Sequence, residues 1–343
     1  MVTSTRQDAA IDTAAATAFF EKNGEPAKAL PPVAVVIAAY NEEGVVGSVV
    51  DALPNTLCGL ATAAIVVSDG SKDGTAAEAS AHGALVCDVP VNRGQGAALR
   101  LGYRLAREGG AQYIVTTDAD GQYNPAEMDA VLAPVAAGQA DFATGSRKLG
   151  SQETNDPVRR LGTWVFAVSI SLLTGQRITD SSFGLRAMRA EVTAAVRLEQ
   201  PQYQSSELLI AVLTHGFRVV EVPATIHKRK VGESKKGHNA IYGLKYAGVV
   251  FGTWWRERQR RVPGSGKAVS SRPAAGPESA QPRCPPRQTN RSPRTPSLQR
   301  RMAPRRRRRR RWTESRCLTR TSRRAAPRQA VPTPVPRPWI PGP

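Results

Sequence analysis

Two aspartates with one residue between them, Asp118 and Asp120, follow a hydrophobic segment at 113–117. At the end of a strand, carboxylates at this spacing can converge on one ion once the chain turns, and Gly121 permits such a turn. Oxygen ligands suit Mg²⁺ or Mn²⁺, which would bridge to a diphosphate and neutralise the charge of a leaving nucleotide. Taken alone, the pattern fits a polar loop equally well, so it indicates a metal site only in combination with other residues.

Two further polar segments could bind a nucleotide. Asp69 ends another apolar run and could accept a hydrogen bond from a base or a ribose. The segment 92–96, Asn-Arg-Gly-Gln-Gly, begins a predicted helix whose amides could line a nucleotide crevice. Each segment also has an ordinary explanation, because Asp-Gly, Ser and Thr form turns and cap helices.

Alternating strand and helix patterns position these segments. We expect strands at 33–39, 63–67, 84–89 and 113–117, and helices at 41–53, 75–82 and 96–108. Short connections between them predict an α/β fold with a mostly parallel sheet flanked by helices. Ligands bind beyond the carboxyl ends of the strands in such sheets. The polar residues at 40–42, 69–71 and 118–120 all fall at those ends, which is more informative than any one of them.

The second half of the chain has a different order of predicted helices and strands. Helices are expected at 159–174 and 207–214, strands at 184–189 and 219–227, and a basic loop at 228–237. The apolar stretches 161–174 and 241–255 are shorter than the roughly 18 residues of a spanning helix. The four cysteines form no C-x-x-C pair, so reduced thiols are expected. These features predict a peripheral protein at the cytoplasmic face of a membrane.

Charge divides the chain into unlike parts. Residues 257–343 contain 24 Lys and Arg but only 3 Asp and Glu, whereas residues 1–256 contain 24 and 25. We expect a helical or disordered extension at 1–30, a catalytic domain at 31–256 and a disordered Arg- and Pro-rich tail at 257–343. The tail could bind anionic lipid, could bind nucleic acid non-specifically, or could lack a specific function. Specific nucleic-acid binding is not expected, because the basic excess belongs to the tail alone.

Seven sequence blocks, in order, resemble the glycosyltransferase family 2 enzymes of the dolichyl- or polyprenyl-phosphate mannose and glucose synthase type. The blocks lie at 35–43, 67–71, 92–98, 118–122, 145–147, 180–186 and 229–235, within a resemblance that covers about 32–256. The resemblance implies a GT-A type nucleotide-binding fold. It also implies inverting transfer of a hexose from GDP-mannose or UDP-glucose to polyprenyl phosphate, with Mg²⁺ or Mn²⁺ as cofactor. Ser68 departs from the Asp that the family frequently has there.

The resemblance also assigns roles to single residues. The nucleoside would be held by Tyr40, Glu42 and Asp69, and the metal and diphosphate by Asp118, Asp120 and Gln122. The acceptor phosphate would be received by Arg147, Arg159 and Arg160. The loop closing on the donor diphosphate would contribute Arg229, Ser234 and Lys235. Asp120 and Arg147 are the residues expected to carry catalysis.

The acceptor determines the expected mechanism. A phosphate monoester dianion is already a nucleophile and needs no strong general base. Positioning and charge stabilisation would then hold two anionic partners in line for one direct displacement. A transferase acting on a sugar hydroxyl in cell-envelope polysaccharide synthesis is the alternative, with Asp180 and Glu207 as candidate bases. A nicotinamide enzyme is disfavoured, because Gly44 and Gly47 do not form a G-x-G-x-x-G motif.

Overall fold

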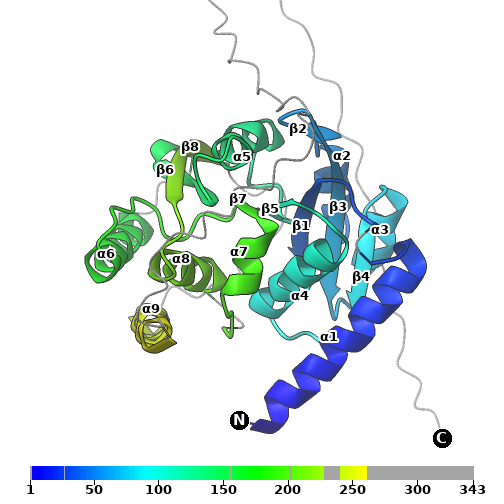
Figure 1. Cartoon of the computed structure of the whole chain (residues 1–343), viewed down its shortest axis with the longest axis horizontal. Helices are drawn as coiled ribbons and strands as arrows, with labels where there is room; N and C mark the ends of the chain where they lie inside the picture. Colours follow the sequence, from blue (N-terminus) through cyan, green and yellow to red (C-terminus); the bar gives the residue numbers. More distant parts are fainter. Residues whose placement is uncertain (1, 27, 154–156, 201–202, 228–239, 261–343) are drawn as a thin grey trace, which may run out of the picture. The chain divides into compact units, whose positions relative to one another are not determined.

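The computed structural model describes residues 2–26, 28–153, 157–200, 203–227 and 240–260 (Figure 1). Within these ranges the side chains of residues 2–6, 157–161, 240–245 and 260 are not described. The strands are β1 (Val33–Ala39), β2 (Thr56–Leu57), β3 (Leu60–Asp69), β4 (Leu85–Val89), β5 (Tyr113–Asp118), β6 (Phe142–Gln152), β7 (Arg186–Arg189) and β8 (Val219–Ile226). The helices are α1 (Val2–Asn23), α2 (Val46–Asp51), α3 (Thr75–Ala81), α4 (Gln95–Glu108), η1 (Pro125–Glu127), α5 (Met128–Ala136), α6 (Pro157–Thr174), α7 (Ala190–Ala195), α8 (Gln204–Thr214) and α9 (Ala240–Arg260).

The strands form one mixed sheet. Strands β4, β3, β1 and β5 lie side by side and run parallel. Strand β7 is antiparallel to both β5 and β6, and β8 is parallel to β6. The carboxyl ends of β3, β1 and β5 therefore meet at one edge of the sheet. The predicted α/β fold with a mostly parallel sheet is confirmed, with β7 and the short β2 as its antiparallel members.

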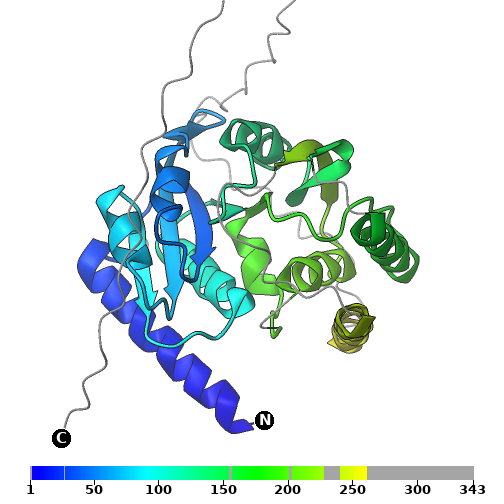
Figure 2. The same cartoon turned by 180° about the vertical axis from the view of Figure 1, so that it is seen from behind.

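Helices cover both faces of the sheet (Figures 1 and 2). Ala34 and Val36 of β1 belong to a core cluster that includes buried side chains of α1, α4 and α8. Val35 and Ile37, the alternate residues of the same strand, belong to the cluster formed with α2 and α5. Successive side chains point to opposite faces of a strand, so a continuous apolar run such as 33–39 is what a strand buried on both faces requires.

The strand at 33–39 is found as predicted, but the helix expected at 41–53 is wrong at its start. Helix α2 begins only at Val46, because amides of the preceding loop are bound by side chains of α3. Glu42 N donates to Thr75 Oγ1 at 2.8 Å, and Gly44 N donates to Glu78 Oε2 at 2.6 Å. Glu42 and Glu43, the acidic residues that favoured an early helix start, lie instead in the loop between β1 and α2.

Further differences lie outside the sheet centre. The sequence patterns did not predict α5, α7 or β6, and β6 is the longest strand of the described chain. Helix α9 continues to Arg260, past the predicted start of the disordered tail, and residues 261–343 lie outside the description. None of the helices in the described ranges is long and apolar enough to cross a membrane.

Candidate active site

The loop after β1 and the loop after β3 are locked together by side-chain to backbone hydrogen bonds. Asn41 Oδ1 accepts from Lys72 N at 2.9 Å, and Glu43 Oε2 accepts from Gly74 N at 3.0 Å. Asn41 has a φ of 52°, a conformation that Asn tolerates better than most residues. Tyr40, half-buried, directly precedes this loop and lies at the same sheet edge as the end of β3. The predicted nucleoside-binding residues Tyr40 and Glu42 are thus held on a rigid pair of loops.

Asp69 ends β3 and is 2% exposed. Its Oδ2 accepts hydrogen bonds from Arg93 N at 2.8 Å and Gly94 N at 2.7 Å, at the start of α4. Burial raises the pKa of Asp69, and the two N–H donors oppose that shift. Oδ1 of the same carboxylate is buried and has no hydrogen-bond partner among the described residues. The carboxylate therefore keeps one acceptor oxygen for a donor group from elsewhere.

Asp118 ends β5 and pairs in register with Ala38 of β1, so it lies beside the loops just described. Its Oδ1 accepts a hydrogen bond from Gln95 Nε2 at 3.0 Å. The segment 93–95 therefore contacts both predicted donor-binding aspartates, Asp69 through its amides and Asp118 through a side chain. As expected from the sequence, both aspartates end strands, and they lie at the same edge of the sheet on either side of β1.

Asp120 is 6% exposed, and its Oδ1 accepts from Gln122 N at 3.1 Å. Gln122 donates from Nε2 to the carbonyl of His227, just beyond β8, at 3.0 Å. The tight turn at 118–122 contains Gly121 with a φ of 68°, which accords with the predicted need for glycine there. Among the described residues, no group of three or more His, Cys, Asp or Glu side chains is arranged to hold a metal ion.

Gly184 leaves space beside Asp118. A Cβ at this position would lie 2.9 Å from Asp118 Oδ2 and 2.8 Å from the Tyr123 hydroxyl. The Tyr123 hydroxyl accepts a hydrogen bond from Gly184 N at 2.8 Å, and burial raises its pKa. The absence of a side chain at 184 therefore keeps one side of the Asp118 carboxylate open.

Arg186 is a charged residue of this region to which the sequence interpretation gave no role. It is 2% exposed at the start of β7, and its charge interacts with Tyr103, Tyr123 and Asp118. Burial lowers its pKa, and its Nε has no hydrogen-bond partner in the described part of the chain. The only sequence feature that could have pointed to a role for Arg186 is its position at the end of the block 180–186.

Arg147 lies on β6, across the sheet from the donor-side aspartates. Its guanidinium binds Asp180 from Nε at 2.6 Å and from one terminal nitrogen at 3.2 Å, and that nitrogen also donates to Ser182 at 2.9 Å. Asp180 is 1% exposed and is the buried partner of the pair. Of the other predicted acceptor residues, Arg159 and Arg160 lie at the start of α6, but their side chains are outside the description. Arg229, Ser234 and Lys235 also lie outside the described residues.

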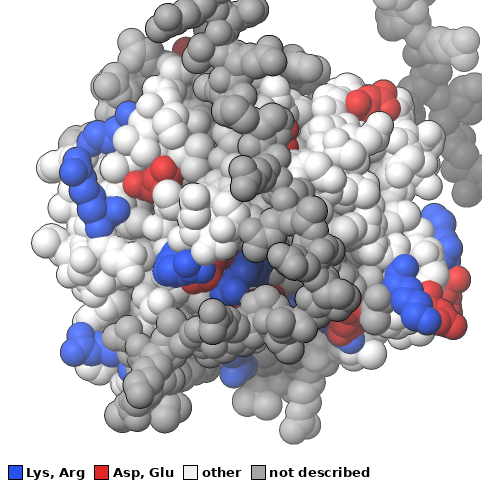
Figure 3. All heavy atoms as spheres, turned by 45° about the horizontal axis from the view of Figure 1, so that its top comes forward, with Lys and Arg blue, Asp and Glu red and all other residues white. Residues whose placement is uncertain are grey.

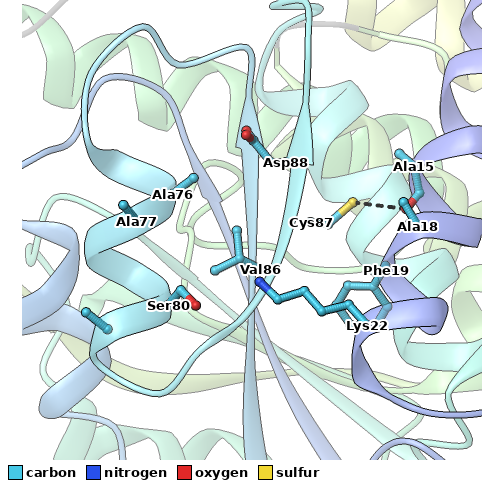
Figure 4. A pocket seen from close by; sticks show the side chains of 11 residues that line it. Ala15, Ala18, Phe19, Lys22, Ala76, Ala77, Ser80, Val86, Cys87 and Asp88 are labelled. Atoms are coloured by element: carbon cyan, nitrogen blue, oxygen red, sulfur yellow. Dashed lines mark hydrogen bonds between the residues drawn. The ribbon is translucent and has the colours of Figure 1, made fainter.

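In the view of Figure 3, the visible Lys and Arg side chains of the described residues lie in separate groups, some of them beside Asp or Glu. A groove of about 540 Å³ lies between α1 and α3 over β4 (Figure 4). The lining of this groove contains none of the predicted site residues. The groove is therefore separate from the candidate site around Asp69 and Asp118.

Comparisons with known proteins agree with this geometry. The model of "Glycosyl transferase family 2" matches residues 34–197. Undecaprenyl-phosphate mannosyltransferase of Micrococcus luteus is 32% identical over 59% of this chain and 86% of that protein. Polyprenol monophosphomannose synthase of Mycolicibacterium smegmatis is 34% identical over 60% of this chain and 82% of that protein.

A solved structure shares the fold. Glucosyl-3-phosphoglycerate synthase from Mycobacterium tuberculosis, in complex with Mn²⁺, uridine-diphosphate and phosphoglyceric acid, superimposes with a TM-score of 0.53. The match has 19% sequence identity and covers 70% of this chain and 81% of the other. At this identity the likeness concerns the fold alone, and it agrees with the expected GT-A type.

Proposed function

The chain belongs to glycosyltransferase family 2, and we propose that it transfers a hexose from a nucleotide-sugar to a polyprenyl phosphate. The names of the two relatives support this acceptor, since one is an undecaprenyl-phosphate mannosyltransferase and the other a polyprenol monophosphomannose synthase. The observation that carries the proposal is the placement of Asp69 and Asp118 at one carboxyl edge of the sheet, on either side of β1, where a nucleotide diphosphate would lie across the strand ends.

On the donor side, Asp69 accepts from the base through its unpartnered Oδ1, and Tyr40 and Glu42 contact the nucleoside. The donor is GDP-mannose or UDP-glucose, and both are included in the test below. Arg229, Ser234 and Lys235, which lie outside the described residues, are proposed to contact the donor diphosphate.

The residues present fit a divalent cation. Asp118 and Asp120 would hold Mg²⁺ or Mn²⁺ with oxygen ligands, Gln122 is the proposed third protein ligand, and diphosphate oxygens would complete the shell. The open side of the Asp118 carboxylate left by Gly184 supports this fit. Bound there, the cation would neutralise charge on the departing nucleoside diphosphate.

In the reaction, an oxygen of the acceptor phosphate attacks the anomeric carbon of the hexose. The bond from that carbon to the donor β-phosphate breaks on the opposite side, and the nucleoside diphosphate leaves with the bonding electrons. One direct displacement inverts the anomeric centre. Arg147, with Arg159 and Arg160, is proposed to bind the acceptor phosphate, because the planar guanidinium fork matches phosphate oxygens.

Transfer to a sugar hydroxyl is less well supported, because it requires a general base. Asp180 is bound by Arg147 at two points, and Glu207 is 0% exposed and accepts from Glu199 N, Gln200 N and Arg256. Both candidate carboxylates are therefore engaged in structural contacts rather than directed at an acceptor hydroxyl. A phosphate nucleophile needs no such base.

A polyprenyl acceptor requires access to lipid, and we propose that α6 and α9 supply it at the membrane surface. Trp164, Leu172, Phe251 and Trp255 are each more than half exposed on these two helices. Trp254 of α9 donates from Nε1 to the carbonyl of Leu173 in α6 at 2.8 Å, which joins the two helices. We further propose a peripheral position at the cytoplasmic face; the free thiols of Cys58 and Cys87 are compatible with a reducing compartment.

The test is incubation of the full chain with polyprenyl phosphate, Mn²⁺ and either radiolabelled GDP-mannose or radiolabelled UDP-glucose. Extraction into organic solvent should recover label as a polyprenyl phosphate sugar from one of the two donors. Mild acid should release the sugar from this product. Label that transfers only to a water-soluble or polysaccharide acceptor would overturn the proposed acceptor.

A further inference from the structure

Helix α1 lies outside the residues that the family model matches, yet it is packed onto the catalytic domain. Its buried residues Ala15, Ala16, Phe19 and Phe20 join the core cluster that includes β4 and α4. Figure 1 shows the helix running along β4 and α4. In Figure 4, Cys87 of β4 points at the Ala15 carbonyl, with Sγ at 3.8 Å.

On this packed side, α1 supplies the counter-charge for a buried arginine. Arg93 NH1 lies 2.8 Å from Asp12 Oδ1 and donates to the Asp8 carbonyl at 3.3 Å. The side chain of Arg93 is only 7% exposed. A guanidinium buried to this degree is costly without an anionic partner. Arg93 comes from the loop before α4, so Asp12 ties α1 to that loop.

The other side of Arg93 faces Asp69. Arg93 Nε and Asp69 Oδ1 are 3.9 Å apart, and both atoms are buried without a hydrogen-bond partner among the described residues. The amides of Arg93 and Gly94 bind the second carboxylate oxygen. The two loops also approach closely, because a Cβ on Gly70 would lie 2.2 Å from Asn92 N. The position of Arg93 therefore determines the surroundings of Asp69.

We infer that the N-terminal helix is part of the donor site: Asp12, 2.8 Å from Arg93, keeps Arg93 Nε at an ion-pair distance of 3.9 Å from Asp69 Oδ1 and out of hydrogen-bond reach, and this leaves that oxygen able to accept from the nucleobase. The inference rests on the proposed function, in which Asp69 binds the base. Asp12 and Arg93 are positioning residues, since neither is assigned a contact with the donor. Without the Asp12 charge, the nearest anion for the buried guanidinium is Asp69, and a direct pair between them would occupy the free oxygen.

The experiment is calorimetric titration of the full-length chain with UDP, GDP and inorganic pyrophosphate in Mn²⁺ buffer. Asp12→Asn, which keeps the side-chain shape and removes the charge, should raise the Kd of the nucleoside diphosphate that binds. The expected rise is about 2- to 30-fold, the range for residues that act on a ligand through another side chain. The Kd of pyrophosphate, which lacks a base, should be unchanged. In rate assays the donor KM should rise while kcat stays the same.

Two variants provide the controls. Asp12→Glu keeps the charge and should recover most of the nucleotide affinity. Glu21→Gln removes an exposed carboxylate from the same helix and should change nothing. Should Asp12→Asn fail to fold, Arg93→Lys is measured in its place. Lysine keeps the charge but cannot reach both Asp12 and Asp69 in the same way. This variant should therefore weaken the binding of the nucleoside diphosphate and leave the binding of pyrophosphate unchanged.

Each outcome has a distinct meaning. Equal nucleotide affinity in wild type and Asp12→Asn would overturn this inference and leave the proposed function standing. Equal weakening of nucleotide and pyrophosphate would also overturn it, because the effect would then be a general loss of structure. A wild-type chain that binds neither UDP nor GDP would overturn the proposed function and this inference with it.

Discussion

Arg147 and Asp180 form a buried two-point ion pair, with Nε and one terminal nitrogen of the arginine on the two carboxylate oxygens at 2.6 and 3.2 Å. The guanidinium also lies over the Phe183 ring, with its carbon 5.9 Å from the ring centroid. A side chain fixed at this many points loses little further freedom when it binds a ligand. Asp180 therefore orients Arg147, and an acceptor phosphate would be received by an arginine that is already positioned.

Arg147→Ala should lower activity towards polyprenyl phosphate while nucleotide affinity stays nearly constant. Loss of one charge-assisted contact costs about 1.5–3 kcal/mol, which corresponds to about a 10- to 150-fold lower rate at subsaturating acceptor. Arg147→Lys should recover only part of the rate, because a point charge cannot reproduce the guanidinium fork. The measurement is kcat/KM for polyprenyl phosphate, together with the Kd of the nucleoside diphosphate.

Asp180→Asn is the matched control for the ion pair. It keeps the shape of the side chain but weakens its hold on Arg147, so its effect on acceptor kcat/KM should be smaller than that of Arg147→Ala. Thermal unfolding of each variant separates loss of fold from loss of activity. Loss of donor binding in Arg147→Ala, with acceptor affinity unchanged, would assign the arginine to the nucleotide-sugar side.

Turnover should require a divalent cation. Asp120→Ala should reduce the rate by orders of magnitude while the chain remains folded, because the proposed cation site would lose one of its two carboxylates. Rates are measured before and after EDTA treatment and on return of Mn²⁺ or Mg²⁺. Circular dichroism serves as the control for folding. Full activity in EDTA would remove the metal from the proposed mechanism.

The centre of the sheet could be predicted from sequence because its signals are local. The run 33–39 is apolar throughout, and a strand buried on both faces needs that pattern. The predicted placement of Asp69 and Asp118 at strand ends follows from the rule that ligands bind beyond the carboxyl ends of parallel strands. Neither inference requires knowledge of contacts between distant residues.

The remaining features depend on such contacts. Strand β6 contains Gly145 and Gly150 and loses its apolar pattern after Ser146, so its second half is a strand only through pairing with β8. Helix α5 contains Pro134, which argues against a helix in a local reading. The Asp12–Arg93 pair joins residues 81 positions apart, and no local pattern predicts it.

Asp141 should stabilise the fold in a pH-dependent way. Burial by itself raises its pKa, but the hydrogen bonds from Arg218 and the charge of Arg189 outweigh burial and lower it below the usual value of 3.8. This stabilisation is present above the pKa of the unfolded chain and is lost as pH falls through the lower folded-state pKa. It should therefore begin to decline below about pH 4 and be absent below the folded-state pKa.

Asp141→Asn should reduce the free energy of unfolding at pH 7 by about 1.5–3 kcal/mol, the range for hydrogen bonds to a charged group. Urea unfolding of both proteins at several pH values measures the difference, which should shrink as the pH approaches the acid limit. Glu191→Gln is a suitable control, because Glu191 is exposed and pairs with the same Arg189. A difference that is constant down to pH 3 would contradict the assignment to the carboxylate charge.

Membrane attachment should depend on the apolar surface of α6 and α9. Leu172 is 79% exposed and Phe251 is 51% exposed, and full burial of such a side chain is worth about 1.5–3 kcal/mol. Leu172→Glu combined with Phe251→Glu should therefore reduce the partition coefficient onto phospholipid vesicles by at least about tenfold. Vesicle co-sedimentation at low and high salt measures the change.

Val91→Glu is the matched control, because Val91 is 54% exposed but lies outside these two helices. It should leave vesicle binding unchanged. The double variant should also lose activity on long-chain polyprenyl phosphate in vesicles while retaining activity on a short, water-soluble prenyl phosphate, since only the former requires the chain to sit on the bilayer. Carbonate washing should release the wild-type protein from membranes at least in part. Equal vesicle binding by the double variant and the control would show that α6 and α9 do not form the lipid-contacting surface.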